Sequence, residues 1–417
     1  MFLFFYNFIL LSFSIFIFSF FLLRLIFSKE NIQSISEKFC LINKKRPKGE
    51  IIWINGVSIG EAKSGLTIAN EILRISPNTT ILFSTSTISA YKEIKKINKK
   101  VILVFLPVDF NFLVKKFVKN WDPSFAFFME SEIWPNIIKE LSRSKCKFII
   151  LNGRMSDKSF FWWRKFNLLT KEIFKQINFC ATQDEISKQR FKKLGTINVR
   201  SAGNIKYLSN KLLVDNKKFI ELEKKIKTKN IITFFSTHKN EEKILIECSK
   251  HLKNIFKDLF FIIVPRHMKN LNTIVKNLEI EDFSYSIRSK NNLKKNHNFY
   301  IANTFGELGL FFKLSKISIV GGSFNKTGGH NPIEVSHFNS AVIFGPNMQN
   351  FKEIKEKILT TKSGIQVKNS KELADKIAYF LKNETERKKI IKNFKKLQIF
   401  EAQKSSLLIQ NIYRKLK

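Results

Sequence analysis

The sequence has few of the groups that hold metal ions or disulfide frameworks. Its four cysteines are far apart and form no Cys-x-x-Cys pair, which argues against a zinc knuckle or a disulfide scaffold and fits a reducing compartment. The six histidines include no pair at metal-ligand spacing, and no Asp-x-Asp motif occurs. A metal site is therefore the weaker interpretation of any acidic pair in this chain.

Acidic residues are also scarce. The chain carries 73 Lys and Arg against 34 Asp and Glu, a formal charge of +39. Nucleic acid, an anionic membrane or an acidic substrate would each explain this excess. The abundance of Lys, Ile, Asn and Phe, with 44 Phe, is also the bias that an AT-rich genome produces. The charge alone therefore does not select a partner.

The first apolar stretch covers residues 2–27 and is longer than the roughly 20 residues that span a bilayer. A cleaved signal peptide is the alternative, but the stretch lacks a basic n-region and a small-x-small cleavage site before Ser28. Six basic residues lie between positions 29 and 48, and the positive-inside rule then places the following body in the cytoplasm. We expect a single membrane anchor at 1–27 and a basic linker at 28–49.

From residue 50 onward, short apolar runs alternate with helical periodicity. Strands are predicted at 51–54, 80–84, 102–106, 125–129, 147–151 and 199–202, and then at 231–235, 259–264, 298–301, 317–321 and 341–344. This alternation favours parallel sheets covered by helices on both faces. The polar, Lys-rich stretch 208–229 is interpreted as a linker or an exposed helix. The predicted fold is α/β, with two Rossmann-like doubly wound domains, 50–207 and 230–417, facing a cleft.

Residues 317–334 contain the strongest local signal. An apolar strand ends in a Gly-rich turn, and a polar cluster then opens what we expect to be a helix. Free backbone N–H groups at such a place bind anions, above all nucleotide phosphates. Pro332 suits a first helical turn, and Glu334 just inside that turn would reach a sugar hydroxyl. The alternative is an ordinary helix cap beside a tight loop.

In the first domain, Glu61 follows a strand and a glycine turn at the start of a predicted helix. A carboxylate there is usually structural and is worth about 0.3–1 kcal/mol of helix stability. Its functional interpretation is a general base facing the cleft, which would take a proton from an acceptor hydroxyl. From its position alone, the structural role is favoured.

A second acidic site ends the strand predicted at 125–129. Glu130 and Glu132 share one face if both are extended, so they could bind a divalent metal or hold a proton. Pro135 starts a helix, which makes Glu132 a candidate cap and leaves Glu130 the freer of the two. Lys206 follows the last strand of this domain and is expected to overlook the cleft.

Cations and glycines follow the strands of the second domain. Arg266 ends the strand predicted at 259–264, where its bidentate fork suits a phosphate. Residues 306–308 open another helix with bare N–H groups. If these strands are neighbours, Arg266, Gly306–Leu308 and Asn331–Glu334 converge on one crevice, which favours a nucleotide site.

Taken together, the motifs resemble those of the 3-deoxy-D-manno-octulosonic acid (Kdo) transferases of lipopolysaccharide synthesis. The resemblance runs from Ile51 to about Phe351, with ten motifs in family order. They are GVSIGE, ESEIWPN, NGRMSDKS, GNIKY, STHKNEE, PRH, GELG, VGGS, GGHNPIE and FGPNMQNF. The sequence departs from the family at Asn55 and Gly56, where His and Ala are common, and at Met268–Asn270, where a proline, an acid and an arginine are usual.

The resemblance implies an inverting, metal-independent glycosyltransferase of the two-Rossmann (GT-B) type that needs no cofactor. Such an enzyme would move Kdo from CMP-Kdo to a lipid A precursor, lipid IVA, at the anionic leaflet of the bacterial inner membrane. Carried over by motif, Glu61 is the base, and Glu130 and Lys206 stabilise the transition state. The implied CMP site comprises Pro265, Arg266, Gly306, Glu307, Leu308, Asn331, Pro332, Ile333 and Glu334.

Two other functions compete with this interpretation. Another GT-B nucleotide-sugar transferase or a UDP-sugar epimerase would share the fold, but would not combine an N-terminal span with these motifs. A basic membrane-tethered nucleic-acid-binding protein would interleave basic residues with exposed aromatics. In this sequence the aromatics lie mainly in the apolar runs, so no nucleic acid partner is expected.

Overall fold

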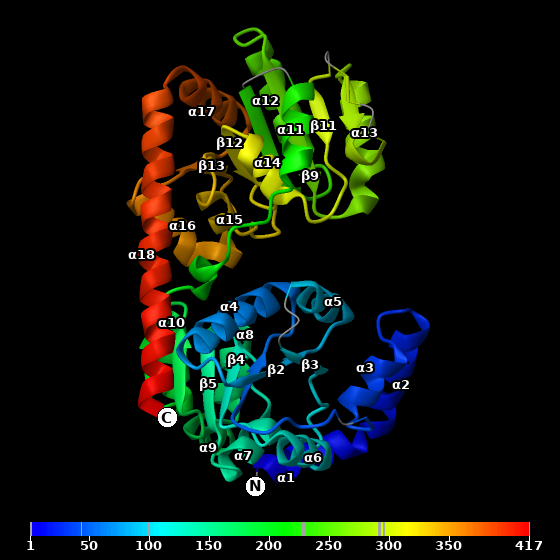
Figure 1. Cartoon of the computed structure of the whole chain (residues 1–417), viewed down its shortest axis with the longest axis vertical. Coiled ribbons are helices and arrows are strands. Elements are labelled where there is room, and N and C mark those ends of the chain that lie inside the picture. Colours follow the sequence, from blue (N-terminus) through cyan, green and yellow to red (C-terminus); the bar gives the residue numbers. More distant parts are fainter. Residues whose placement is uncertain are drawn as a thin grey trace. The chain divides into compact units, whose positions relative to one another are not determined.

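The computed structural model describes residues 2–42, 44–97, 101–226, 230–290, 293–294 and 297–416. The chain forms two compact units, one made of Met1–Ser209 with Glu401–Lys417 and the other of Asn210–Phe400 (Figure 1). Each unit contains one seven-stranded sheet whose paired strands are all parallel. The predicted pair of doubly wound α/β domains is therefore confirmed.

The sheet of the first unit has the order β3-β2-β1-β4-β5-β6-β7. Its strands are β1 (Ile51–Asn55), β2 (Thr80–Thr85), β3 (Ile102–Phe105), β4 (Phe125–Met129), β5 (Lys147–Gly153), β6 (Phe179–Thr182) and β7 (Val199–Ser201). Every residue of β1 and β4 is buried, because helices cover both faces of the sheet. Alternate residues face opposite ways, so Trp53 and Phe128 enter one core while Ile54 and Phe127 enter the other.

The covering helices fall between the strands, as the sequence predicted. In the first unit they are α4 (Ile59–Ile75), α5 (Ile88–Ile97), α6 (Asn111–Trp121), α7 (Pro135–Arg143), α8 (Asp157–Lys165), α9 (Asn167–Lys175) and α10 (Glu185–Leu194). In the second unit they are α11 (Asn216–Lys225), α12 (Glu242–Lys253), α13 (Leu271–Ile280), α14 (Leu308–Leu314), α15 (Ile333–Ser336), α16 (Lys352–Thr360) and α17 (Ser370–Lys382).

The sheet of the second unit has the order β10-β11-β9-β8-β12-β13-β14. Its strands are β8 (Asn230–Thr237), β9 (Leu259–Pro265), β10 (Tyr285–Ile287), β11 (Phe299–Ile301), β12 (Ile317–Val320), β13 (Ala341–Phe344) and β14 (Ile365–Gln366). The central strands β11, β9, β8 and β12 are consecutive neighbours, so the loops that follow them leave the same edge of the sheet.

The end of the chain lies in the first unit. The prediction from the sequence had instead assigned all of residues 230–417 to the second domain. The last helix, α18 (Glu384–Leu416), is continuous, and its residues from Glu401 onward belong to the first unit (Figure 1). The reason is apolar burial: Ile409 and Tyr413 are at most 2% exposed in the core beside β1 and β4. The Tyr413 hydroxyl also donates to Glu50 Oε2 at 3.0 Å.

The boundary at residues 208–229 also shifts, because the second compact unit begins at Asn210. Of the two interpretations of this stretch, the exposed helix is confirmed, since it contains the mostly exposed α11. A side chain of this helix, Leu222, is buried, which explains why an otherwise polar segment belongs to the folded unit.

We predict that Ile409→Ala lowers the free energy of unfolding of the first unit by about 2–5 kcal/mol, because it leaves a cavity in a closed core. Leu407 is the matched control, since it lies two residues earlier on the same helix and is 58% exposed. Its change to Ala is expected to cost less than about 0.5 kcal/mol. Urea unfolding followed by tryptophan fluorescence measures both, and equal effects would contradict the packing described.

The N-terminal apolar stretch, expected to form a single membrane-spanning anchor, is not one helix. It forms α1 (Phe2–Ser12) and α2 (Ser14–Ile26), which are bent by 57° at their junction. Within the described residues no single helix is long and apolar enough to cross a membrane, whereas this bent pair meets that test of length and composition together. Many of its large side chains are more than half exposed, namely Phe4, Phe5, Phe8, Ile9, Leu11, Phe13, Ile15, Phe16, Phe18, Phe20, Leu23 and Ile26.

Polar contacts fix α1, the first of these two helices, to the first unit. The Tyr6 hydroxyl donates to Asp109 Oδ2 at 2.9 Å, and the Asn7 amide donates to Asn136 Oδ1 at 3.1 Å. Asp109 also accepts the backbone N–H groups of Asn136 and Ile137, which satisfies donors at the start of α7. Helix α1 is therefore part of the folded unit.

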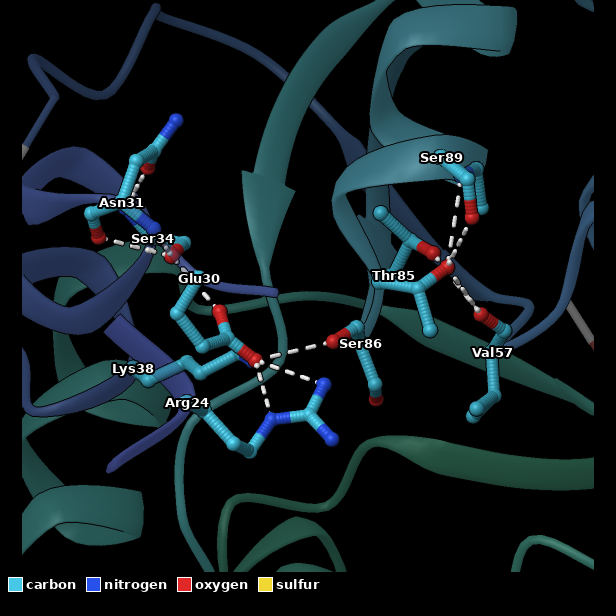
Figure 2. A network of polar contacts seen from close by, with 11 residues as sticks. Arg24, Glu30, Asn31, Ser34, Lys38, Val57, Thr85, Ser86 and Ser89 are labelled. Carbon is cyan, nitrogen blue, oxygen red and sulfur yellow. Dashed lines mark hydrogen bonds and ion pairs between the residues drawn. The ribbon is translucent and has the colours of Figure 1, made fainter. Parts of the chain in front are cut away.

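The segment expected as a basic linker, 28–49, contains α3 (Ile32–Lys38) and a buried ion cluster (Figure 2). Glu30 is 3% exposed and accepts from Lys38 Nζ at 2.7 Å and from Ser34 Oγ at 2.6 Å. Lys38 Nζ also donates to the carbonyl oxygen of Ser86 at 2.9 Å. Burial lowers the pKa of Lys38, and the hydrogen bond to Glu30 opposes that shift. This buried pair ties the linker to the turn after β2.

Candidate active site

Glu61 lies in the first turn of α4, directly after β1. Its Oε1 accepts from Ser58 Oγ at 2.8 Å and its Oε2 accepts from Val57 N at 3.1 Å, while Glu61 N donates to Ser58 Oγ at 3.3 Å. The carboxylate thus completes a reciprocal cap with Ser58. Burial raises the pKa of Glu61, the Ser58 hydrogen bond lowers it, and the charge of Glu130 raises it further. A cap with a raised pKa can also serve as a proton acceptor.

Two threonines from the end of β2 and the turn after it hold the loop before α4. The carbonyl oxygen of Val57 accepts from Thr85 Oγ1 at 3.2 Å and from Thr87 Oγ1 at 3.3 Å (Figure 2). Gly56 lies against the helix so closely that a Cβ would stand 2.9 Å from Ala62 N and Glu61 O. In this chain the contact leaves no room for a side chain at position 56.

Asn55, the other departure in this loop, is fully buried. Its Oδ1 accepts from Ser84 Oγ at 2.7 Å, and Ser84 Oγ accepts from Trp53 Nε1 at 2.8 Å. The side chain is therefore part of the sheet interior. Its Nδ2 has no hydrogen-bond partner among the described residues.

Glu130 follows β4, the strand next to β1, so the parallel register brings it to the same edge as Glu61. It has φ of 56°, a left-handed conformation that a residue other than glycine adopts only under constraint. Lys206, in the short helix Ile205–Leu208 after β7, places Nζ 3.6 Å from Glu130 Oε1. The structure therefore brings together Glu61, Glu130 and Lys206, the three residues that the sequence named.

Glu132 joins this group, although it was expected to cap a helix. The residue at the N-cap of α7 is Trp134 and no side chain caps that helix, so the expected Glu132 cap is wrong. Instead, Glu132 Oε2 accepts from Trp134 Nε1 at 2.8 Å. Burial is the main reason that the pKa of Glu132 is raised to about 7. The hydrogen bond from Trp134 lowers this pKa, while the charges of Glu61 and Glu130 raise it.

This crowding of carboxylates predicts a pH effect on stability. The folded-state pKa of Glu132 lies above its ordinary value, so its contribution is present at low pH and is lost as the pH rises toward 7. The variant Glu132→Gln keeps an oxygen that can accept from Trp134 Nε1. Because its side chain does not ionise, it does not lose stability as the pH rises. We expect its urea midpoint to match that of the wild type at about pH 4, below the ordinary pKa of a glutamate, and to exceed it at about pH 8. A wild type that is at least as stable as the variant at the higher pH would contradict this prediction.

In the second unit, four basic side chains follow neighbouring strands. His238 follows β8, Arg266 and His267 follow β9, and His330 lies in the loop after β12. The Nε2 atoms of His238 and His330 are 2.8 Å apart, and their nearly parallel rings have centroids 5.1 Å apart. The His267 ring lies edge-on to His238 at 5.7 Å. The sequence named only Arg266, because the histidines are isolated in the chain and only the sheet order brings them together.

The Gly-rich loop after β12 is not the open set of N–H groups that the sequence suggested. The buried carboxylate of Glu241 accepts from Gly322 N at 2.7 Å, from Phe324 N at 3.0 Å and from His238 N at 3.0 Å. Gly321 N donates to Phe235 O at 2.8 Å, at a contact where a Cβ would stand only 2.4 Å from that oxygen. A protein acid thus occupies the place expected for a phosphate.

The predicted helix at the end of this loop is short. Pro332 is the N-cap residue rather than the first helical residue, and α15 has four residues. Asn331 Oδ1 accepts from Ile333 N at 3.1 Å. Pro332 and Ile333 are buried, whereas Asn331 and Glu334 are half-buried. Of these four predicted CMP-site residues, only Asn331 and Glu334 have appreciably accessible side chains.

Glu307, another predicted CMP residue, forms an ion cluster. Its carboxylate accepts from Arg288 at 3.0 and 3.1 Å, from Lys218 at 2.9 Å and from Thr304 Oγ1. Burial alone would raise the pKa of Glu307, but these hydrogen bonds outweigh it and lower the pKa to about 2. The neighbouring Gly306 is exposed with φ of 80°, and Phe305 is 81% exposed.

The two groups of residues lie at the carboxyl edges of two different sheets. The first combines a capped acid of raised pKa with an ion pair and a third acid. The second combines Arg266 and three imidazoles with the Glu307 cluster, after the neighbouring strands β11, β9, β8 and β12. Convergence of Arg266 with the two loops was predicted on the condition that these strands are neighbours, and that condition is met. The edge of the first sheet is suited to proton abstraction, and the edge of the second sheet is suited to binding an anion.

Comparisons with known proteins agree with this division. Residues 33–209 match the family described as 3-deoxy-D-manno-octulosonic-acid transferase (kdotransferase), and residues 215–397 match glycosyl transferases group 1. The 3-deoxy-D-manno-octulosonic acid transferase of Rickettsia bellii is 36% identical over 361 residues, 86% of each chain. The enzyme of the same name from Haemophilus influenzae is 29% identical over 373 residues, 87% of this chain and 86% of its own.

A solved structure shows the same fold. The crystal structure of a glycosyltransferase from Rickettsia africae superposes with a TM-score of 0.63 at 15% identity and covers 89% of this chain and 99% of its own. At that identity the likeness concerns the fold alone.

Proposed function

The chain belongs to the 3-deoxy-D-manno-octulosonic-acid transferase family, and we propose that it moves Kdo from CMP-Kdo to the lipid A precursor lipid IVA with inversion at the transferred carbon. The observation that carries this proposal is the group formed by Glu61, Glu130 and Lys206. At one edge of the sheet, this group combines Glu61, whose raised pKa suits a base, with the ion pair between Glu130 and Lys206. The Arg266 edge of the second unit provides the complementary nucleotide site.

In the proposed reaction, Glu61 takes the proton of the acceptor hydroxyl as that oxygen attacks the transferred carbon. The bond from that carbon to the CMP phosphate breaks on the opposite face, which inverts the configuration. Negative charge then grows on the phosphate, where the exposed guanidinium of Arg266 stabilises it. Glu130 and Lys206, paired at 3.6 Å, stabilise the charge that develops on the sugar and on the attacking group.

No metal or cofactor has a role in this proposal, because a guanidinium and imidazoles meet the phosphate. We further propose that α1 and α2 hold the protein at the anionic leaflet of the bacterial inner membrane, with the body in the cytoplasm. Their exposed aromatic side chains support insertion. The basic residues that follow support attraction to the leaflet, at roughly 1 kcal/mol for each Lys or Arg near the surface.

The test is an assay of the full-length protein in detergent with CMP-Kdo and lipid IVA, with the products weighed by mass spectrometry. The expected result is an acceptor that is heavier by whole Kdo units, at a rate that a chelator does not change. Absence of Kdo transfer, together with tighter binding of UDP than of CMP in calorimetry, would reject the donor and with it the proposed function.

A further inference from the structure

We propose that His238, His267 and His330, together with Arg266, form a proton-linked site for the phosphate of the leaving nucleotide, which takes up a proton when that phosphate binds. The inference rests on the proposed function, because it takes a cytidine monophosphate as the ligand. It adds three residues and a proton to a site for which the sequence supplied only Arg266 and backbone groups.

The contact between two imidazoles limits the charge of the empty site. A distance of 2.8 Å between the Nε2 atoms of His238 and His330 requires one nitrogen to donate and the other to accept. Two imidazolium rings would present two donors to each other, so the pair carries at most one positive charge. The rings are nearly parallel, with an interplanar angle of 10°, and this orientation suits a hydrogen bond between the two nitrogens.

The surroundings of the pair disfavour even that one charge. Burial, Arg266, His238 and His267 lower the pKa of His330 to about 3, and burial, His267 and Arg266 lower that of His238. Glu241 is the acid joined to this loop, but its two oxygens already accept three backbone N–H groups. Arg266 and the three imidazoles are therefore groups that can carry positive charge, and among the described residues none of them is paired with a carboxylate.

A phosphate provides the missing counter-charge. When the bond to the sugar breaks, its electron pair stays on the phosphate oxygen, and a phosphodiester with one negative charge becomes a monoester with two. Arg266 balances one charge, and a protonated imidazole of the pair balances the second. Arg266 and His267 are exposed while His238 and His330 are half-buried, so the cluster is open to a ligand. The site is thus matched to the product nucleotide.

The experiment is calorimetry of CMP binding to the full-length protein in detergent at neutral pH, in two buffers that differ in ionisation enthalpy. The dependence of the measured heat on the buffer gives the number of protons exchanged. We expect net uptake for CMP and none for cytidine, which lacks the phosphate. His330→Gln and His238→Gln, made separately, are each expected to abolish the uptake and to weaken CMP binding about tenfold.

His251→Gln is the matched control, because His251 is an exposed imidazole in the last turn of α12. It is expected to bind CMP and take up protons as the wild type does. CMP binding without proton uptake, or uptake that persists in both His330→Gln and His238→Gln, would overturn this inference while leaving the proposed function in place. Absence of CMP binding by the wild type would instead overturn the proposed function.

Discussion

Glu61→Gln is expected to lower the rate of Kdo transfer by about 10²- to 10⁴-fold and to leave CMP affinity unchanged. The amide cannot take the proton of the acceptor hydroxyl. It retains an oxygen that can accept from Val57 N or Ser58 Oγ, the two groups that hold the carboxylate. The change in helix stability is therefore expected to stay within the roughly 1–2 kcal/mol that a helix cap contributes.

The measurement is single-turnover transfer, accompanied by calorimetry with CMP and by a thermal melt. Glu185→Gln is the matched control, because it removes a carboxylate from the first turn of α10 that pairs with Lys188 on the same helix. Transfer at near the wild-type rate by Glu61→Gln would show that the carboxylate is only a cap, the role that its position in the sequence favoured.

Glu241→Ala is expected to destabilise the second unit by several kcal/mol and to abolish CMP binding. It removes the acceptor for the N–H groups of His238, Gly322 and Phe324, and each buried donor left unpaired costs about 1–3 kcal/mol. The same change releases the loop that carries His330. Glu241→Gln keeps the volume but has a single acceptor oxygen, so an intermediate loss is expected.

Urea unfolding and calorimetry with CMP measure the two effects of the Glu241 changes. Glu247→Gln provides the control, since it alters an exposed acid on the same helix, α12. Wild-type stability and CMP affinity in Glu241→Ala would mean that the Gly-rich loop holds its shape without this carboxylate.

Much of the fold could be predicted because buried parallel strands are continuous apolar runs. The runs at Ile51–Asn55, Phe125–Met129 and Leu259–Pro265 each form a central strand. Strands β6, β10 and β14 were missed; they have four, three and two residues, and such short runs carry little pattern. The tail was assigned by chain order, although the burial of residues such as Tyr413 depends on a core that local sequence does not reveal.

The site shows the same division. Glu61, Glu130 and Lys206 could be named because each lies in a motif that resembles the family, in the segment after a strand, and the strand order brings those segments to one edge. The role of Glu241 depends on Gly322 and Phe324, which come from another segment, and the raised pKa of Glu132 depends on its burial and on the charge of Glu61. Composition and spacing carried no signal for either. A Gly-rich turn indicates where backbone N–H donors gather. It does not show that Glu241, at the start of α12, already accepts from Gly322 N and Phe324 N.

The division of the first unit between the two ends of the chain has a consequence for its synthesis. Because Ile409 and Tyr413 complete a core whose strands were made more than two hundred residues earlier, a nascent chain on the ribosome cannot close that core until these residues have been synthesised. During that interval the newly made N-terminal half would expose an apolar face to chaperones. A fragment expressed only as far as residue 209 would keep that exposed face permanently.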